Sequence, residues 1–235
     1  MNSRAARGFT LVELLVALFV LALLAVLSWR GLDGMARAQA QTESRADETL
    51  TLQVGLAQWG ADLDAMVQLP QASAIEWNGR VLRLTRRSTA AATDGVLVVA
   101  WTRRVVNGVG TWLRWQSPLA VTRGELDTAW QQADVWSQSP GVEQMRREVS
   151  VVPLQEWQIF FYRENAWTNP LSSDIQGAPP APPAGGAPAG GAPARALTPV
   201  IPDGVRLVLT LPPGPSITGT LTRDWVRPTL GGGKG

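Results

Sequence analysis

The sequence contains neither cysteine nor histidine, and it has a single lysine, Lys234. Thiolate nucleophiles, Cys–His zinc sites, haem ligation through histidine and the Ser–His–Asp triad are therefore excluded. Disulfide bonds are excluded as well. Catalysis would have to rest on carboxylates, arginine, serine or the lone tyrosine, so we expect no enzyme, no metal site and no cofactor.

Charge is also scarce. The formal net charge of +2 is accounted for by Arg4 and Arg7. The arginine doublets at 86–87, 103–104 and 146–147 are scattered along the chain and do not form a basic cluster. We therefore expect no nucleic-acid partner.

What the sequence does contain is a long apolar run, from Phe9 to Trp29. As a helix it would be about 32 Å long, which matches the hydrocarbon thickness of a bilayer. No small-residue signal-peptidase site follows it, because Trp29 and Arg30 come directly after. The basic residues before it favour a cytoplasmic N-terminus and a periplasmic remainder.

One carboxylate, Glu13, stands inside this run. A charge there costs on the order of 3 kcal/mol on insertion scales. A short basic leader precedes it and ends at Gly8, and the leader is followed by Phe9, Thr10, Leu11, Val12 and Glu13. This pattern resembles the class III leader of type IV pilins and of type II secretion pseudopilins.

The resemblance implies that a prepilin peptidase cuts between Gly8 and Phe9 and methylates the new amino group of Phe9. It also implies that Glu13 guides each subunit into a filament. Pairing Glu13 with the ammonium of Phe9, within one subunit or between neighbours, would relieve two unfavourable burials. A plain signal anchor with a stray glutamate is the simpler alternative.

We predict one helix from Phe9 to about Val67, closed by Pro70, with residues 9–29 in the membrane and 30–69 in the periplasm. Gly31 and Gly34 would weaken it just outside the membrane. Apolar residues that recur at helical spacing predict the face that packs on a sheet: Leu50, Val54, Ala57, Leu63 and Val67. Asp62 and Asp64 are expected on a solvated surface.

Residues 70–171 predict a β-rich domain. Asn78-Gly79 predicts a hairpin with a type I′ turn, and a second turn is expected near Asn107-Gly108. Residues 124–139 fit a short helix or an irregular excursion, and strands are expected on either side of Pro153. Six of the eleven tryptophans fall in or beside predicted strands and are expected in the sheet core: Trp77, Trp101, Trp112, Trp115, Trp157 and Trp167. A sugar-binding row of exposed tryptophans is the alternative.

Residues 172–198 are rich in alanine, glycine and proline and are expected to form a flexible loop. Residues 199–229 predict closing strands of the same domain, and residues 230–235 a disordered tail. The predicted fold class is therefore α+β: a long N-terminal helix packed on a mainly antiparallel sheet system, as in pilins.

Within that superfamily, the chain most resembles the J class of minor pseudopilins. The resemblance is carried by "SWRGLDGM" after the apolar run, and by "FFYRENAW" followed by "IPDGVRLVL". It implies a subunit of the periplasmic pseudopilus tip that primes filament assembly and helps to export folded proteins. The implied partners are the I-class and K-class minor pseudopilins, the major pseudopilin, the prepilin peptidase, the inner membrane and secreted substrates.

Two alternatives remain from the sequence. One is a minor pilin of a type IV pilus, with a role in assembly, adhesion or DNA uptake; many such pilins close a C-terminal loop with a disulfide, and this chain has no cysteine. The other is a membrane-anchored glycan-binding module.

Overall fold

The computed structural model describes residues 9–88, 95–171, 201–214 and 217–228. It divides the chain into two compact units, Met1–Asp47 and Glu48–Gly235, which we consider separately. The expected leader, the Ala/Gly/Pro-rich loop and the C-terminal tail lie outside the described residues.

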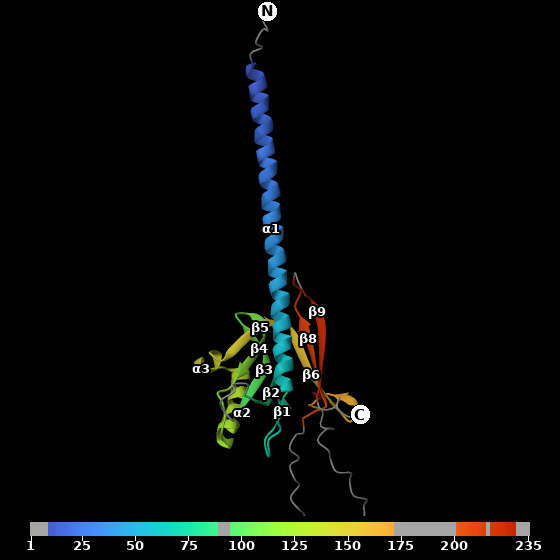
Figure 1. Cartoon of the computed structure of the whole chain (residues 1–235). Helices are drawn as coiled ribbons and strands as arrows, with labels where there is room; N and C mark the ends of the chain where they lie inside the picture. The colour runs from blue at the N-terminus through green and yellow to red at the C-terminus, as the bar shows by residue number, and fades with distance from the viewer. Residues whose placement is uncertain (1–8, 89–94, 172–200, 215–216, 229–235) are drawn as a thin grey trace, which may run out of the picture. The chain divides into compact units, whose positions relative to one another are not determined.

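A single helix, α1 (Leu11–Asp64), opens the chain (Figure 1). It ends six residues before Pro70, so proline is not what stops it. The residues just after it instead bond to the second strand of the chain, residues 81–87: the amide of Val67 donates to the carbonyl of Thr85 at 3.0 Å. Gly31 and Gly34 are both helical, so the weakening expected there does not interrupt α1.

The face of α1 that is buried differs from the predicted one. The buried apolar residues are Leu52, Trp59 and Leu63, whereas Leu50 is 56% exposed and Val54 is 68% exposed. Of the predicted face, only Leu63 is buried. Apolar residues recur at helical spacing on two sides of this helix, and spacing alone does not say which side meets the sheet.

Gly55 also lies on the buried side of α1. A Cβ atom at Gly55 would overlap the side chain of Val151 and lie 3.5 Å from the ring of Trp112. The glycine therefore lets the helix backbone approach the sheet more closely than any other residue would allow. A sequence pattern built on large apolar residues does not register this kind of contact.

The first sheet has five antiparallel strands in chain order. These are β1 (Ile75–Trp77), β2 (Val81–Arg87), β3 (Val96–Val106), β4 (Val109–Gln116) and β5 (Glu148–Pro153). The strand expected before Pro153 is thus confirmed as β5. A register shift between Trp112 and Leu113 interrupts the pairing of β4 with β5.

The hairpins are confirmed, but the turn at Asn78-Gly79 is not type I′. Only Gly79 has a positive φ, and the Asn78 side chain accepts hydrogen bonds from the amides of Arg80 and Val81. Asparagine thus builds an Asx-type turn here. The turn at Asn107-Gly108 has positive φ at both residues, as a type I′ turn requires.

The remaining strands form a second sheet in the order β7-β6-β8-β9, all antiparallel. They are β6 (Glu156–Arg163), β7 (Ala166–Thr168), β8 (Gly204–Leu211) and β9 (Gly219–Val226). The closing strands β8 and β9 therefore extend a sheet that starts with β6 and do not extend the first sheet. The sequence did not distinguish the two sheets.

Residues 124–139, for which the sequence allowed either a short helix or an irregular excursion, form a helix, α2 (Arg123–Gln138). A capping box starts it: the Thr122 hydroxyl accepts from the Glu125 amide, and the Glu125 carboxylate accepts from the Thr122 amide. The hydrogen bonds that the carboxylate accepts from the amides of Thr122 and Val121 lower the pKa of Glu125. A four-residue helix, α3 (Val142–Met145), follows.

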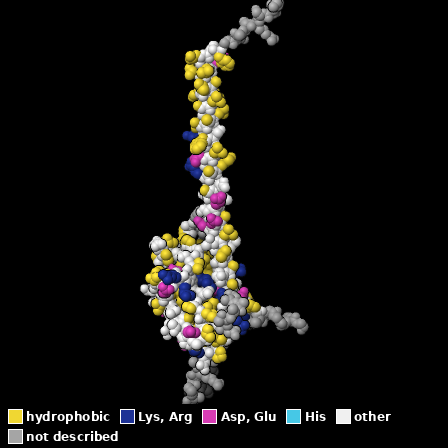
Figure 2. Space-filling view, turned by 60° about the vertical axis from the view of Figure 1, so that its left-hand side comes forward, with side chains coloured by type: hydrophobic (Ala, Val, Ile, Leu, Met, Phe, Trp, Pro, Cys, Tyr) yellow, Lys and Arg dark blue, Asp and Glu magenta, His cyan; other side chains and the backbone are white. Residues whose placement is uncertain are grey.

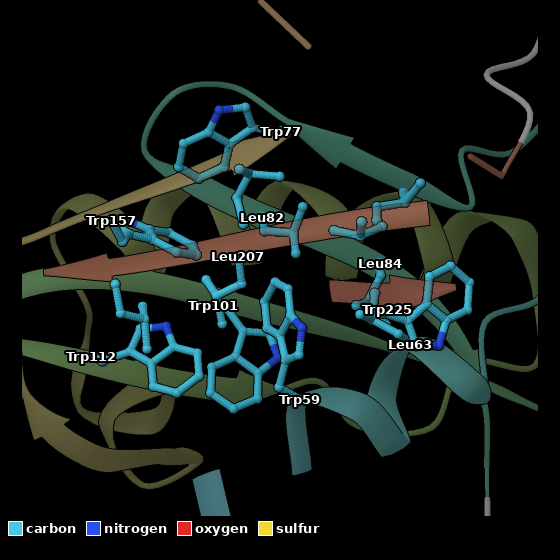
Figure 3. Packing of buried hydrophobic residues seen from close by; sticks show 14 of the residues in the cluster. Trp59, Leu63, Trp77, Leu82, Leu84, Trp101, Trp112, Trp157, Leu207 and Trp225 are labelled. Atoms are coloured by element: carbon cyan, nitrogen blue, oxygen red, sulfur yellow. The ribbon is translucent and has the colours of Figure 1, made fainter. Parts of the chain in front are cut away.

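Two hydrophobic clusters fill the second unit. The larger one joins α1 to both sheets and contains Trp59, Trp101 and Trp112, which lie together in Figure 3. The smaller one lies under α2, where the rings of Trp115 and Trp136 stack with their centroids 6.0 Å apart.

The tryptophans expected in the core were Trp77, Trp101, Trp112, Trp115, Trp157 and Trp167. All are buried except Trp167, which is half-buried. The core assignment is therefore confirmed for five of these six. The α+β class is also confirmed, with a long N-terminal helix and antiparallel sheets.

Two glycines on the same helix make a matched test of the close approach. Gly55→Ala should lower the free energy of unfolding by about 1–3 kcal/mol, because the added methyl group overpacks the contact with Val151. Gly60→Ala should raise it by about 0.5–1 kcal/mol, since nothing lies within 4 Å of the new Cβ atom and alanine favours the helix. Urea denaturation followed by tryptophan fluorescence measures both. Equal effects at the two positions would contradict the packing described.

Candidate functional site

The N-terminal part of α1 is apolar around its whole surface. It contains the one segment among the described residues that is long and apolar enough to cross a membrane, with a mean hydropathy of 2.8. Its large side chains are exposed: Phe9 by 86% and Trp29 by 74%, at the two ends of the run. Figure 2 shows hydrophobic side chains spread along this part of the helix. Length and composition thus fit a membrane anchor.

Glu13 and Thr10 form a reciprocal pair at the start of α1. The Glu13 carboxylate accepts hydrogen bonds from the amide and the hydroxyl of Thr10, at 3.0 and 2.9 Å. The hydroxyl of Thr10 in turn accepts from the Glu13 amide at 3.3 Å. This is a capping box, which satisfies backbone donors that the helix itself leaves free.

The site residues expected from the sequence, Gly8, Phe9 and Glu13, belong to the start of the chain. Phe9 and Thr10 lie in non-helical backbone directly before α1, and Glu13 is in its first turn. Gly8 lies outside the described residues. The structure therefore brings Glu13 to the first residues of the expected mature chain, through Thr10.

At the other end of α1, Asp62 lies at the centre of a buried polar cluster. Arg114 binds both of its oxygens, with Nε 2.7 Å from Oδ2 and Nη2 2.8 Å from Oδ1. Arg86 Nη1 is 2.5 Å from Oδ1, and the indole nitrogen of Trp101 is 3.0 Å from Oδ2. Gln58 donates to Oδ1 at 2.9 Å. Asp62 thus joins α1 to β2, β3 and β4.

The expectation of a solvated surface was wrong for Asp62, which is fully buried. An aspartate at a helix C-terminus is unfavourable to the helix dipole, and two arginines compensate for it here. Arg86 comes from one of the scattered arginine doublets of the sequence. Nothing in the spacing of these residues connects them, because they lie on separate elements of the sequence.

Asp64, two residues further on, reaches the second sheet. Its Oδ1 accepts a hydrogen bond from the indole nitrogen of Trp225 on β9 at 2.8 Å. Asp64 itself is exposed, as expected. The two aspartates on either side of Leu63 therefore tie the same turn of α1 to both sheets.

On the side of α1 opposite the buried residues Leu52, Trp59 and Leu63, the helix carries a second apolar row, which we call the outward stripe. It consists of Leu50, Val54, Ala57 and Ala61, all exposed. Their spacings of four, three and four residues are those of a helix–helix seam. The stripe has the pattern of a surface that packs against another helix.

Trp167 lies across the outer face of the second sheet. Its ring is 4.2 Å from the guanidinium carbon of Arg206 and 5.1 Å from the ring of Tyr162. A Cβ atom on Gly204 would lie 3.3 Å from the Trp167 ring, so the glycine leaves room for it. The tryptophan and the "PDGV" strand start that carried the J-class resemblance are thus in contact.

Arg206 also binds Asp224 on the neighbouring strand with two hydrogen bonds of 2.7 Å. These hydrogen bonds raise the pKa of Arg206 and lower the pKa of Asp224. Both side chains are about one-third exposed, so solvent screens the pair.

Among the described residues, no three potential ligands of the types His, Cys, Asp and Glu lie close enough together to hold a metal ion. A pocket of about 260 Å³ lies between α2 and the residues before β1. The arginines that line it are ion-paired, Arg83 with Glu76 and Arg123 with Asp127.

Comparison with known proteins identifies the N-terminus. Residues 3–29 match the family described as the prokaryotic N-terminal methylation motif. The resemblance of the leader to prepilin-type leaders is thereby confirmed. No curated protein sequence matches the chain.

One solved structure that matches part of the chain is the crystal structure of the GspK–GspI–GspJ complex from the type 2 secretion system of enterotoxigenic Escherichia coli. The match covers 76% of this chain and 96% of the other, at 17% identity and a TM-score of 0.43. A likeness this distant does not assign the chain to that complex.

The buried cluster makes a prediction about stability. Asp62→Ala should lower the free energy of unfolding by about 3–5 kcal/mol, because it leaves two arginines buried without their carboxylate. Asp64→Ala is the matched control and should cost about 1 kcal/mol, the typical worth of one hydrogen bond. Chemical denaturation measures both; a loss for Asp62→Ala no larger than for Asp64→Ala would contradict the assignment.

The Arg206–Asp224 pair should account for part of the loss of folding stability at acid pH. Because the pKa of Asp224 is lowered in the folded chain, the pair stabilises fully above the ordinary aspartate pKa of about 3.9. That stability is lost as the pH falls through the lowered value. Asp224→Asn should therefore flatten the decline of stability in this acid range, measured by denaturation at a series of pH values. An unchanged pH profile would contradict the role of the pair.

Proposed function

We propose that the chain is a non-enzymatic minor pseudopilin of a type II secretion system, of the J class. The observation that carries this proposal is the N-terminal methylation motif at residues 3–29, followed without a break by a helix that is first apolar and then packs on antiparallel sheets. The order of the Trp167 turn and the Pro-led strand supports the J class.

The first step of this function is processing at the membrane. The prepilin peptidase cuts between Gly8 and Phe9 and methylates the Phe9 amine, while residues 9–29 anchor the chain in the inner membrane. The N-terminus is cytoplasmic, and the sheets are in the periplasm. Phe9 is suited to this step, because it precedes the helix and is 86% exposed.

Glu13 then serves filament assembly. Cleavage creates an ammonium group at Phe9, and the Glu13 carboxylate is held one helical turn away by Thr10. Neutralising that ammonium, in the same subunit or a neighbour, relieves the cost of two charges in hydrocarbon. The capping box keeps the carboxylate at the start of the helix until a partner arrives.

The periplasmic part of α1 supplies a second contact. The outward stripe offers apolar residues at helix-seam spacing, and packing it against a neighbouring helix would bury them. We infer that the I-class and K-class minor pseudopilins and the major pseudopilin pack here. The resulting tip complex would prime the filament and help to export folded proteins.

The alternatives are less well supported. A glycan-binding module would need a row of exposed tryptophans, but six of the seven tryptophans in the described strands are buried, and the seventh, Trp167, is half-buried. A minor pilin of a type IV pilus would share the N-terminal motif. The identity of the partners distinguishes the pilus from the secretion system.

The outward stripe gives a test of partner binding. The full chain should co-purify in detergent with the I-class and K-class minor pseudopilins from the same genome. Val54→Asp should abolish co-purification, because it places a charge in the seam. Val135→Asp, at a residue of α2 that is 51% exposed, is the matched control and should have no effect. Co-purification with pilus minor pilins instead would contradict the type II assignment.

Glu13 gives a test of assembly. Glu13→Val should still be cleaved and methylated, because the cut lies outside the helix, but it should enter filaments poorly. Immunoblots of sheared filaments, compared with the total membrane pool, measure this incorporation. Normal incorporation of the variant would remove the proposed role of the carboxylate.

A further inference from the structure

The four sheet edges among the described strands differ in how they are protected. β1 and β7 are three residues long, and β5 ends at Pro153 and pairs through a shifted register. Short strands, proline, irregular pairing and charged side chains are the usual devices that keep an edge from binding another strand. β9 has only the last of these, in Arg223 and Asp224.

β9 is eight residues long and pairs with β8 in one unbroken register from Gly219 to Val226. Trp225 is buried and Leu221 is half-buried; the other residues of β9 are exposed. No described strand pairs with its second side. The strand therefore offers a long, regular edge.

One contact shows which residues of β9 direct their backbone N–H and C=O groups toward β8 and which direct them away from it. The amide of Arg227 donates to the carbonyl of Asp203 at 2.9 Å, one pair beyond the register of β8 with β9. In an antiparallel ladder, bonded and non-bonded pairs alternate. The odd-numbered residues of β9 therefore direct their backbone groups to β8, and the even-numbered ones direct theirs outward: Thr220, Thr222, Asp224 and Val226.

The side chains specify what could pair there. Leu221, Arg223 and Trp225 share the face of the sheet that adjoins the core, since their neighbours on β8 are Leu209, Leu207 and Val205. Arg223 is exposed and makes no ion pair with any residue in the described ranges. On the opposite face, Asp224 already binds Arg206. The uncompensated charge of the edge is thus positive.

We propose that the free edge of β9 binds an extended segment of another protein as an additional antiparallel strand. Cross-strand pairs set the chemistry of that segment. The residue opposite Arg223 is acidic, and the residues two positions away on either side, opposite Leu221 and Trp225, are apolar. Backbone hydrogen bonds provide affinity, and this apolar–acidic–apolar alternation provides specificity.

This surface is separate from the proposed assembly contacts. The outward stripe and Glu13 lie on α1, whereas the new site consists of one strand edge. The inference does not depend on the assignment to a secretion system, since any extended acidic partner would satisfy it.

The test uses the full chain in detergent micelles and a fluorescent heptapeptide, Thr-Val-Lys-Glu-Thr-Val-Thr, whose glutamate falls opposite Arg223. A second peptide has lysine in place of glutamate. Fluorescence anisotropy should show that the glutamate peptide binds about three- to tenfold more tightly, because like charges oppose each other in the lysine peptide. Arg223→Glu should reverse this preference.

Thr222→Pro is the backbone test. It removes an outward amide and leaves the bonds to β8 in place, so it should abolish binding of both peptides. The midpoint of thermal unfolding establishes that the variant is folded, and Arg223→Glu, which leaves the backbone intact, tests the proposal independently of it.

Three results would overturn the proposal. The first is the absence of binding by either peptide at millimolar concentration. The second is equal affinity for the two peptides in both the parent chain and Arg223→Glu. The third is a concentration-dependent dimer that Thr222→Pro dissociates, because a second copy of the chain would then occupy the edge.

Discussion

The carboxylate of Asp62 determines how α1 meets the sheets. It is fully buried, and it receives Arg114 in a bidentate pair, Arg86 and the indole of Trp101. A buried charge is tolerated only with such partners, so the helix can take one rotation about its axis. That rotation brings Gly55 onto Val151 and turns Leu50 and Val54 outward. The core and the outward stripe therefore depend on the same contact.

The two ends of α1 thus use carboxylates in different ways. Glu13 caps the helix through Thr10 and is exposed, whereas Asp62 is enclosed and fixes a rotation. In the proposed function, the Glu13 carboxylate binds a neighbouring subunit. The Asp62 carboxylate determines which side of the helix is exposed to that neighbour. The outer edge of β9 lies on the second sheet, which Asp64 joins to the same end of α1 through Trp225.

Much of the fold could be predicted from the sequence, because local signals carried it. The apolar run, the strand alternation and the glycine-containing turns gave the helix, the hairpins and the α+β class. The N-terminal motif is also local, and its match is confirmed. The buried face of α1 could not be predicted, because it depends on a glycine contact and on arginines from other strands. The prediction of a type I′ turn at Asn78 was wrong for a related reason, because the asparagine side chain accepts hydrogen bonds from the amides of Arg80 and Val81.

Mass spectrometry of the chain purified from the inner membrane would establish whether it is processed as a prepilin-type subunit. We expect a mature N-terminus at Phe9 that carries one methyl group on its amine. A chain that keeps residues 1–8, or that is cut after the apolar run, would contradict this processing and leave Glu13 without an ammonium to pair with.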